Sequence, residues 1–176
     1  SIYGVNPLAD GESYSQLVGG KQIVVSSFKT GEQTGVLFDV NDTKGKIKLD
    51  RIDGYILSPN QKNILLRTQT QSIYRHSTTA VYYIYNVQNR TIEPLSDGGP
   101  QECPLWSNDG NMVAFVREGN LFLVKLLFNN AEIQITKDGK FNHIINGKAD
   151  CVYEEEFVTN RSFDFNADNS IIVQGC

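Results

Sequence analysis

The stretch at 105–115 reads LWSNDGNMVAF, and the same pattern occurs twice more in the chain. The other copies are ILSPNQKNILL at 56–66 and FDFNADNSIIV at 163–173, and all three align without gaps. Each copy has an apolar strand end, a small polar residue, a turn of Pro, Asn, Asp or Gly residues, and a second apolar strand. Proline presets φ, and Asn, Asp and Gly tolerate a left-handed backbone, so each copy predicts a tight turn between two antiparallel strands.

The copies recur at a regular distance. Ser58, Ser107 and Asn166 occupy the same place in them, 49 and 59 residues apart. Two further apolar segments lie between consecutive copies: AVYYIYNV with TIEPL, and NLFLV with AEIQIT. Each repeat therefore contains four short strands, which is typical of a blade of a β-propeller.

The predicted fold class is all-β, since the periodic segments are short and rich in β-branched and aromatic residues. We expect a partial β-propeller with about three four-stranded antiparallel blades plus the start of another. The segment 22–40 predicts a hairpin of a preceding blade, so residues 1–21 form an N-terminal lead-in and 22–176 an incomplete propeller. An ordinary β-sandwich with chance similarity at three turns is the alternative fold.

The blade count also bears on association. Closed propellers use about four to eight blades, and an open arc leaves sheet edges and apolar faces uncovered. We therefore expect either a piece of a longer protein or a chain that associates, with a homo-oligomer as the expected form.

The composition excludes several classes of partner and cofactor. The net charge of −4 comes with no basic patch that could neutralise phosphates, so we expect no nucleic-acid partner. The longest apolar run, LFLVKLLF at 121–128, is too short to cross a bilayer. Only His76 and His143 are present, and neither has a ligand three or four residues away, so we expect no metal and no cofactor.

Three cysteines, Cys103, Cys151 and Cys176, are widely spaced and include no CxxC pair. Their odd number and wide spacing are typical neither of a zinc site nor of a disulfide framework. We expect small buried or surface thiols.

A cluster of negative charge stands out at 151–157, CVYEEEF. Three adjacent glutamates repel one another, and their aromatic neighbours make unpaired carboxylates costly if the region is partly buried. Either the glutamates face water as a solvated acidic loop, or they bind a cation. Neighbouring side chains on a strand point to opposite faces, whereas a helical turn lets two adjacent carboxylates converge on a primary ammonium.

The longer stretch IINGKADCVYEEEF at 144–157 resembles a segment of dipeptidyl peptidase IV-type serine peptidases, which usually reads I-x-N-G-x-x-D-W-V-Y-E-E-E. The resemblance implies a short helical excursion near 148–160 that projects into the central cavity of the propeller. It also implies that Glu155 and Glu156 hold the free α-ammonium of a peptide substrate, with Glu154 preceding them.

A second stretch supports the same resemblance. YRHSTTAVYYIYNVQNR at 74–90 is similar to the R-H-S-x-x-A-x-Y-x-I-Y-D strand of that family. The family's arginine contacts the carbonyl oxygen of the first substrate residue, and it falls on Arg75. The generic W-S-P-D-G blade phrase appears here as Trp106-Ser107-Asn108-Asp109-Gly110.

The sequence contains no recognisable motif of catalytic residues. The 176 residues include no GxSxG nucleophile elbow, no HExxH motif and no P-loop. The resemblance implies that the serine, aspartate and histidine belong to a C-terminal α/β-hydrolase domain that is missing here, so this chain alone should be inactive. It also implies an exported enzyme that removes dipeptides from peptide N-termini. The alternative is a non-catalytic propeller module for protein interaction, with the glutamates as an acidic contact loop.

Overall fold

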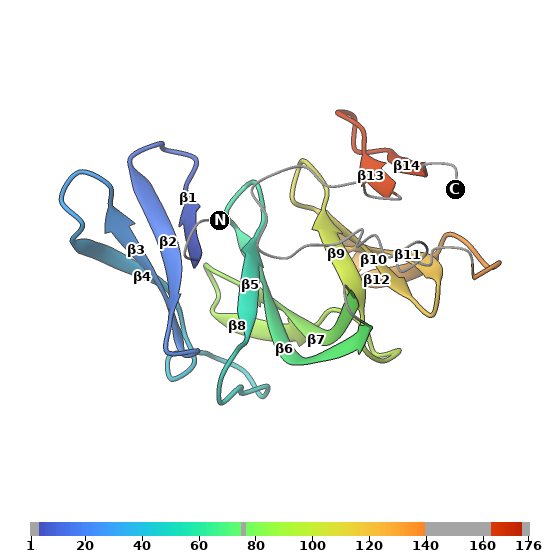
Figure 1. Cartoon of the computed structure of the whole chain (residues 1–176), viewed down its shortest axis with the longest axis horizontal. Coiled ribbons are helices and arrows are strands. Elements are labelled where there is room, and N and C mark those ends of the chain that lie inside the picture. The colour runs from blue at the N-terminus through green and yellow to red at the C-terminus, as the bar shows by residue number, and fades with distance from the viewer. Residues whose placement is uncertain (1–3, 75–76, 140–162, 174–176) are drawn as a thin grey trace.

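The computed structural model describes residues 4–74, 77–139 and 163–173, and their strands form four antiparallel sheets that follow one another in chain order (Figure 1). The first sheet contains β1 (Val5–Pro7), β2 (Ser13–Val18), β3 (Gln22–Ser27) and β4 (Gln33–Asp39). The second contains β5 (Gly54–Leu57), β6 (Asn63–Tyr74), β7 (Ser77–Asn86) and β8 (Thr91–Pro94). The third contains β9 (Glu102–Trp106), β10 (Met112–Arg117), β11 (Asn120–Lys125) and β12 (Ala131–Gln134), and β13 (Phe163–Phe165) pairs with β14 (Ile171–Val173).

This arrangement confirms the predicted partial propeller. Each four-stranded sheet is a meander in which every strand pairs with its neighbours in sequence, and β13 and β14 begin a further sheet. The predicted hairpin at 22–40 is β3 and β4. Two strands, β1 and β2, lie within the range that we assigned to a lead-in, so the first sheet has four strands. These two strands were hard to predict, because β1 is only three residues long and β2 mixes polar with apolar residues. The domain boundaries and the helical excursion near 148–160 stay predictions, and the excursion lies outside the described residues.

The faces of neighbouring sheets pack on one another, because alternate residues of a strand point to opposite faces. On β6, Ile64 and Leu66 are buried against the first sheet, and Leu65 between them is buried against the third. The cluster between the first and second sheets includes Ile23, Phe38, Val40, Ile52, Tyr85 and Ile92. The cluster between the second and third includes Tyr82, Leu95, Trp106, Val113, Phe115 and Phe122.

The third sheet repeats this alternation one step further along the chain. Val113 and Phe115 of β10 face the second sheet, whereas Ala114 and Val116 face β13 and pack with Phe163. The indole N–H of Trp106 also donates to the carbonyl of Ile56 at 3.0 Å, which links the third sheet to the second. Each described interface is therefore an apolar layer between two sheets.

All three copies of the repeated phrase form a tight turn between two antiparallel strands, as predicted. The first two turns are equivalent, and the third is one residue shorter, since the Asn166 N–H donates to the Ser170 carbonyl four residues on. In the first, the Ser58 N–H donates to the Asn63 carbonyl and the Asn63 N–H donates to the Ser58 hydroxyl. Ser107 and Met112 make the same two contacts in the second copy. The fourth residue of the turn has a positive φ in every copy: 60° at Gln61, 74° at Gly110 and 67° at Asn169. Local side chains therefore specify the turn even where glycine is absent.

Side-chain amides join these turns from one sheet to the next. Asn60 Nδ2 donates to the carbonyl of Asp109 at 2.9 Å, and Asn108 Nδ2 donates to the carbonyl of Asn166 at 2.6 Å. The repeated turns therefore lie at a common end of the sheets, which we call the turn end.

Cys103 corrects one expectation. It is buried at 2% exposure and is disulfide-bonded, so reading all three cysteines as thiols is wrong. Spacing in the sequence did not reveal this because a disulfide depends on distance in the fold, and an odd count does not exclude one bond. Cys151 and Cys176 lie outside the described residues.

The part of the chain that the structure describes contains no helix that is long and apolar enough to span a membrane.

Phe115 tests the packing between sheets. Its ring is fully buried and stacks on Phe122 with ring centroids 5.4 Å apart. Phe115→Ala should lower the free energy of unfolding by about 3–5 kcal/mol, because it removes buried area and leaves a cavity. Val36→Ala, at a side chain that is 48% exposed, is the control and should cost less than about 1 kcal/mol. Urea denaturation measures both, and equal losses would contradict the interface model.

Asp109 gives a pH prediction for the turn. The hydroxyl of Ser107 and the N–H of Asn111 bond its carboxylate and hold its pKa below the ordinary value of 3.8. A lowered folded-state pKa stabilises the fold above the unfolded pKa, and this stabilisation is lost as the pH falls through the folded pKa. Asp109→Asn should therefore be less stable than the parent at pH 7, with a gap that narrows below about pH 4. Urea midpoints across this range test it, and a gap independent of pH would count against it.

Candidate functional site

The strand order places two sets of connections at the end opposite the turn end. Because each sheet is an antiparallel meander, the connection from its second to its third strand and the connection from its fourth strand to the next sheet lie at one end. We call this the hairpin end. It includes the β2–β3, β6–β7 and β10–β11 hairpins.

Arg75 belongs to the longest of these hairpins. β6 has 12 residues and β7 has 10, whereas β2 and β3 have six each. Pairing of β5 ends where Gly54 meets Arg67, so the hairpin continues beyond the sheet from Thr68 onward. Arg75 and His76 connect β6 to β7 and lie outside the described residues. The described flanks of Arg75 are therefore the last residue of β6, Tyr74, and the first of β7, Ser77.

Hydrogen bonds fix the base of the β6–β7 extension. Gln101 is fully buried, and its Oε1 accepts the N–H of Tyr82 at 3.0 Å. The backbones of Ala80 and Gln101 exchange two further hydrogen bonds of 3.0 and 2.8 Å. On the other strand, the N–H of Thr70 donates to the carboxylate of Asp53 at 3.0 Å. These contacts set the direction in which the hairpin leaves the second sheet.

Glu154, Glu155 and Glu156 also lie outside the described residues. Their segment follows Gly139, after β12, and precedes Phe163, where β13 begins. β12 runs toward the hairpin end and β13 starts from it. The strand topology thus brings both flanks of the glutamate segment to the same end as the β6–β7 hairpin. The predicted contact between these glutamates and a substrate amine stays a prediction.

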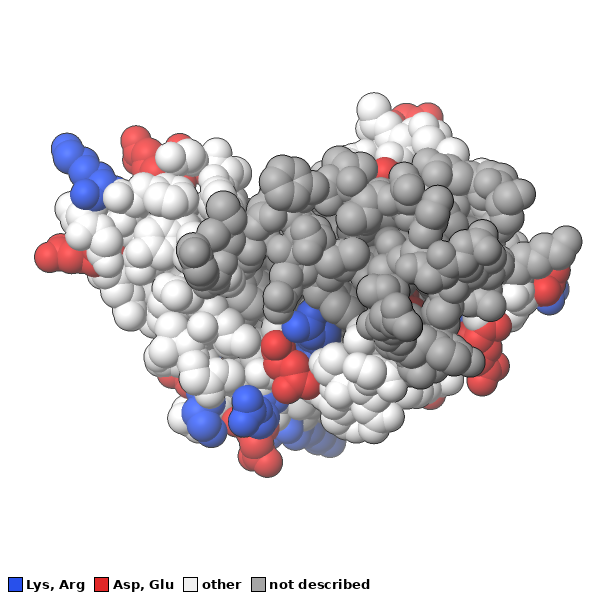
Figure 2. Space-filling model, viewed as in Figure 1, with Lys and Arg blue, Asp and Glu red and all other residues white. Residues whose placement is uncertain are grey.

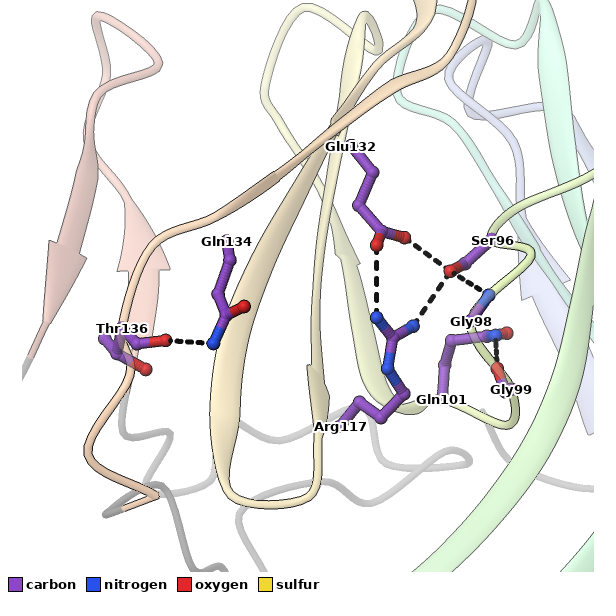
Figure 3. Close-up of polar contacts among 8 residues, drawn as sticks. All are labelled: Ser96, Gly98, Gly99, Gln101, Arg117, Glu132, Gln134 and Thr136. Atoms are coloured by element: carbon purple, nitrogen blue, oxygen red, sulfur yellow. Dashed lines mark hydrogen bonds and ion pairs between the residues drawn. The ribbon is translucent and has the colours of Figure 1, made fainter.

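A polar cluster at the hairpin end joins the second and third sheets (Figure 3). Arg117, the last residue of β10, donates to Glu132 of β12 at 3.1 Å and to the Ser96 hydroxyl at 2.9 Å. Ser96 also donates to Glu132 and accepts the N–H of Gly98 at 3.1 Å. The arginine side chain is 15% exposed and that of Glu132 is 30% exposed, so the ion pair is partly shielded from water.

Arg117 is held by packing as well as by its ion pair. Its guanidinium carbon lies 4.2 Å from the centroid of the Phe122 ring. A Cβ at Gly98 would lie only 2.6 Å from that carbon, so the loop after β8 approaches the arginine as closely as glycine allows. The cluster is thus a structural brace between β8, β10 and β12.

Sequence reasoning missed Ser96, Gln101, Arg117 and Glu132. They belong to no motif. Ser96, Arg117 and Glu132 come from three separate segments, so only the fold brings these three together. Within the described ranges, no group of three or more His, Cys, Asp or Glu residues could hold a metal ion. On the face in Figure 2, the described basic and acidic residues are interspersed, in keeping with the absence of a basic patch in the sequence.

The chain is similar in sequence to a known protein family and to several of its curated members. The family model described as "Dipeptidyl peptidase IV (DPP IV) N-terminal region" matches residues 58–174. Among curated proteins, a probable dipeptidyl-aminopeptidase B of Aspergillus fumigatus is 38% identical over 108 residues, which is 60% of this chain and 12% of that protein. The probable dipeptidyl-aminopeptidase B of Aspergillus oryzae is 34% identical over 138 residues, which is 70% of this chain and 15% of that protein.

Among solved structures, the crystal structure of Porphyromonas gingivalis dipeptidyl peptidase 4 matches with a TM-score of 0.80 and 38% sequence identity. The match covers 96% of this chain and 24% of that one. This chain therefore spans about a quarter of the solved relative, and less than a sixth of the two fungal relatives.

The brace at Arg117 generates a stability prediction. Arg117→Ala should lower the free energy of unfolding by about 2 kcal/mol, because it removes two charge-assisted hydrogen bonds and the contact with Phe122. Arg117→Lys should recover only part of this loss, since an ammonium cannot reproduce the guanidinium fork. Thermal or urea unfolding measures both variants. A lysine variant as stable as the parent would mean that charge alone is sufficient.

Proposed function

The chain belongs to the dipeptidyl peptidase IV N-terminal region family, and from that premise we propose that it is the substrate-recognition propeller segment of a serine exopeptidase. In this proposal the enzyme removes dipeptides from peptide N-termini. Glu155 and Glu156 bind the free α-ammonium of the substrate, and Arg75 orients the first carbonyl group.

The observation that supports this function best is the extent of the family match. It runs from 58 to 174 and so includes both Arg75 and the three glutamates. The motifs around them are the most specific in the chain. The strand topology is compatible with the proposal, since the chain positions next to both motifs lie at the hairpin end.

The chemistry of these residues suits an ammonium ligand. A primary ammonium has three N–H donors, so two carboxylates can accept most of them. One ion pair at about 4 Å is worth roughly 4 kcal/mol before desolvation, at an effective dielectric constant near 20. The planar guanidinium of Arg75 offers donors in a fixed geometry that suits a carbonyl oxygen. A site of this kind selects peptides by a free N-terminus.

We assign catalysis to an α/β-hydrolase domain outside these 176 residues, because they contain no GxSxG motif. The partners of this chain in the proposal are that domain and peptides with a free N-terminus, with self-association through open sheet edges. We also propose that the protein is exported. The disulfide at Cys103 supports an oxidising compartment.

Glutamine substitutions test the ammonium site in the full-length protein. Glu155→Gln and Glu156→Gln should each lower kcat/KM for dipeptide release by the equivalent of about 2–4 kcal/mol, since the bound ammonium loses a charged partner. Glu154→Gln, which makes the same change one position earlier, is the matched control and should have a much smaller effect.

N-acetylated peptides complete this test, because acetylation removes the charge and two of the three N–H donors. The parent should discriminate strongly against them, and the two glutamine variants should discriminate less. If free and acetylated peptides bind equally well to the parent, the glutamates do not bind an ammonium. The alternative of a non-catalytic interaction module with an acidic contact loop would then be favoured.

A further inference from the structure

A row of polar side chains ends the apolar face that the second sheet presents to the third. Leu65 of β6 and Ile84 of β7 belong to the apolar cluster between these two sheets. Two residues nearer the turn end, the same face carries Asn63 and Asn86, which pair across the strands. Thr91 of β8 pairs with Asn86 and extends the row. The apolar layer is therefore followed at the turn end by three adjacent polar side chains.

The architecture of the sheets does not require amides at this place. Met112 aligns with Asn63 in the repeated phrase, and it pairs with Lys125 across the third sheet. The corresponding pair of the first sheet is Ser13 and Ser27. Among these three sheets, which share one strand order, only the second has two amides there. The amide pair is therefore a feature of this position and not of the repeat.

The polar row lines an open cleft of about 520 Å³ between the turn ends of the second and third sheets. Leu126, Leu127 and Asn130, which connect β11 to β12, line it from the third sheet. Leu126 is partly buried against the apolar cluster, whereas Leu127 is 73% exposed. The charged residues of the lining are Lys62 and Glu93, whose charges are opposite. The cleft thus combines amides and a hydroxyl with an aliphatic wall, and its lining has no net charge.

The polar groups of the cleft retain the capacity to bond a ligand. In the part of the chain that the structure describes, the side chains of Asn63, Thr91 and Asn130 make no hydrogen bond. Asn86 uses its Oδ1, which accepts the N–H of Asn89 at 2.9 Å, and its Nδ2 makes no bond to a described residue. An amide offers donors and an acceptor, and a hydroxyl offers both as well. These groups therefore suit a ligand that both donates and accepts hydrogen bonds.

Hydrogen bonds already hold the two walls of the cleft in place. Asn60 Nδ2 donates to the Asp109 carbonyl at 2.9 Å and so joins the turns from which the walls rise. The N–H of Leu126 donates to the Asn111 carbonyl at 2.9 Å, which ties the segment after β11 to the start of β10. A site that is formed before the ligand arrives loses less conformational entropy when the ligand binds.

We infer that this cleft binds a neutral saccharide. The hydroxyl groups at the edge of a sugar ring donate and accept, so they match the amides and Thr91, and the C–H groups on its face match Leu127. The balanced charge of the lining disfavours phosphates and metal ions. An extended peptide would instead need a free strand edge, and Lys44 already bridges β8 at Thr91. The inference goes beyond the ammonium site and does not depend on it.

Substitutions in the full-length protein test each part of the cleft. Asn63→Leu removes an amide at nearly constant size. Asn86→Asp removes the Nδ2 donors but keeps an Oδ1 that can accept the N–H of Asn89, so the turn is preserved. Leu127→Ser removes the aliphatic wall. Asn41→Leu is the matched control, because it makes the asparagine-to-leucine change at an exposed residue that does not line the cleft.

Calorimetry with cellotriose, maltotriose and tri-N-acetylchitotriose, all neutral trisaccharides, measures the affinity. We expect at least one of them to bind the parent with a Kd below about 1 mM. Asn63→Leu and Asn86→Asp should each raise that Kd about tenfold, because hydroxyls of the sugar lose their partners. Leu127→Ser should raise it about threefold to tenfold through lost apolar contact, and Asn41→Leu should leave it unchanged.

The inference is refuted if no trisaccharide binds with a Kd below about 1 mM, or if the Asn63 and Asn86 variants bind like the parent. N-acetyl-triglycine amide, a peptide without ammonium or carboxylate, tests the competing ligand. Tighter binding of this peptide than of every trisaccharide would assign the cleft to peptides and also refute the inference. Glu155→Gln and Glu156→Gln should not change trisaccharide binding, and a loss there would place the sugar outside the cleft. Failure of the saccharide site therefore leaves the ammonium site untouched.

Discussion

A sheet with two apolar faces is stable in water only when another layer covers each face, and this requirement organises the whole chain. The strands of the second and third sheets bury alternate residues on opposite sides, as Ile64 and Leu65 do on β6. No single sheet can satisfy both faces by itself. Successive sheets therefore stack through apolar layers, and the curved row in Figure 1 follows from that stacking. The polar contacts at the two ends align sheets that the apolar layers hold together.

The functional positions depend on this stacking through topology. A meander of four strands returns the chain to the end from which it started, so every connection between sheets is adjacent to the hairpins of that end. The described flanks of both motifs lie at such connections: β6 ends at Tyr74 and β7 begins at Ser77, and the chain is described up to Gly139 and again from Phe163. The flanks of two motifs separated by some 80 residues in sequence thus lie at the same end of the described sheets. The fold can present a substrate site there because these connections are free to vary while the sheets stay constant.

Local sequence was sufficient to predict the turns and most of the strands. The serine of the first two phrases, like the asparagine of the third, bonds backbone groups within five residues, and the left-handed position follows at a fixed distance, so the whole signal lies in a short window. The first two strands were missed because their residues lack a clear alternation. The contacts of Arg117 with Ser96 and Glu132 could not be predicted, since they join residues from three different elements. The disulfide of Cys103 could not be predicted from the spacing of the cysteines, because it depends on distance in the fold. Arg75, Glu155 and Glu156 rest on motif resemblance, and the structure describes their flanks alone.

The order of the strands in each sheet also affects how the chain can fold during its synthesis. Every sheet uses one continuous stretch of chain, and its strands pair in the order in which a ribosome would release them. A finished sheet already offers an apolar face and, at its turn end, a side-chain amide such as Asn60 that awaits the backbone of the next turn. Assembly can therefore proceed from the N-terminus, with each sheet acting as a template for its successor. Under that order of events, the third sheet and its β10–β11 hairpin would exist before the glutamates were synthesised.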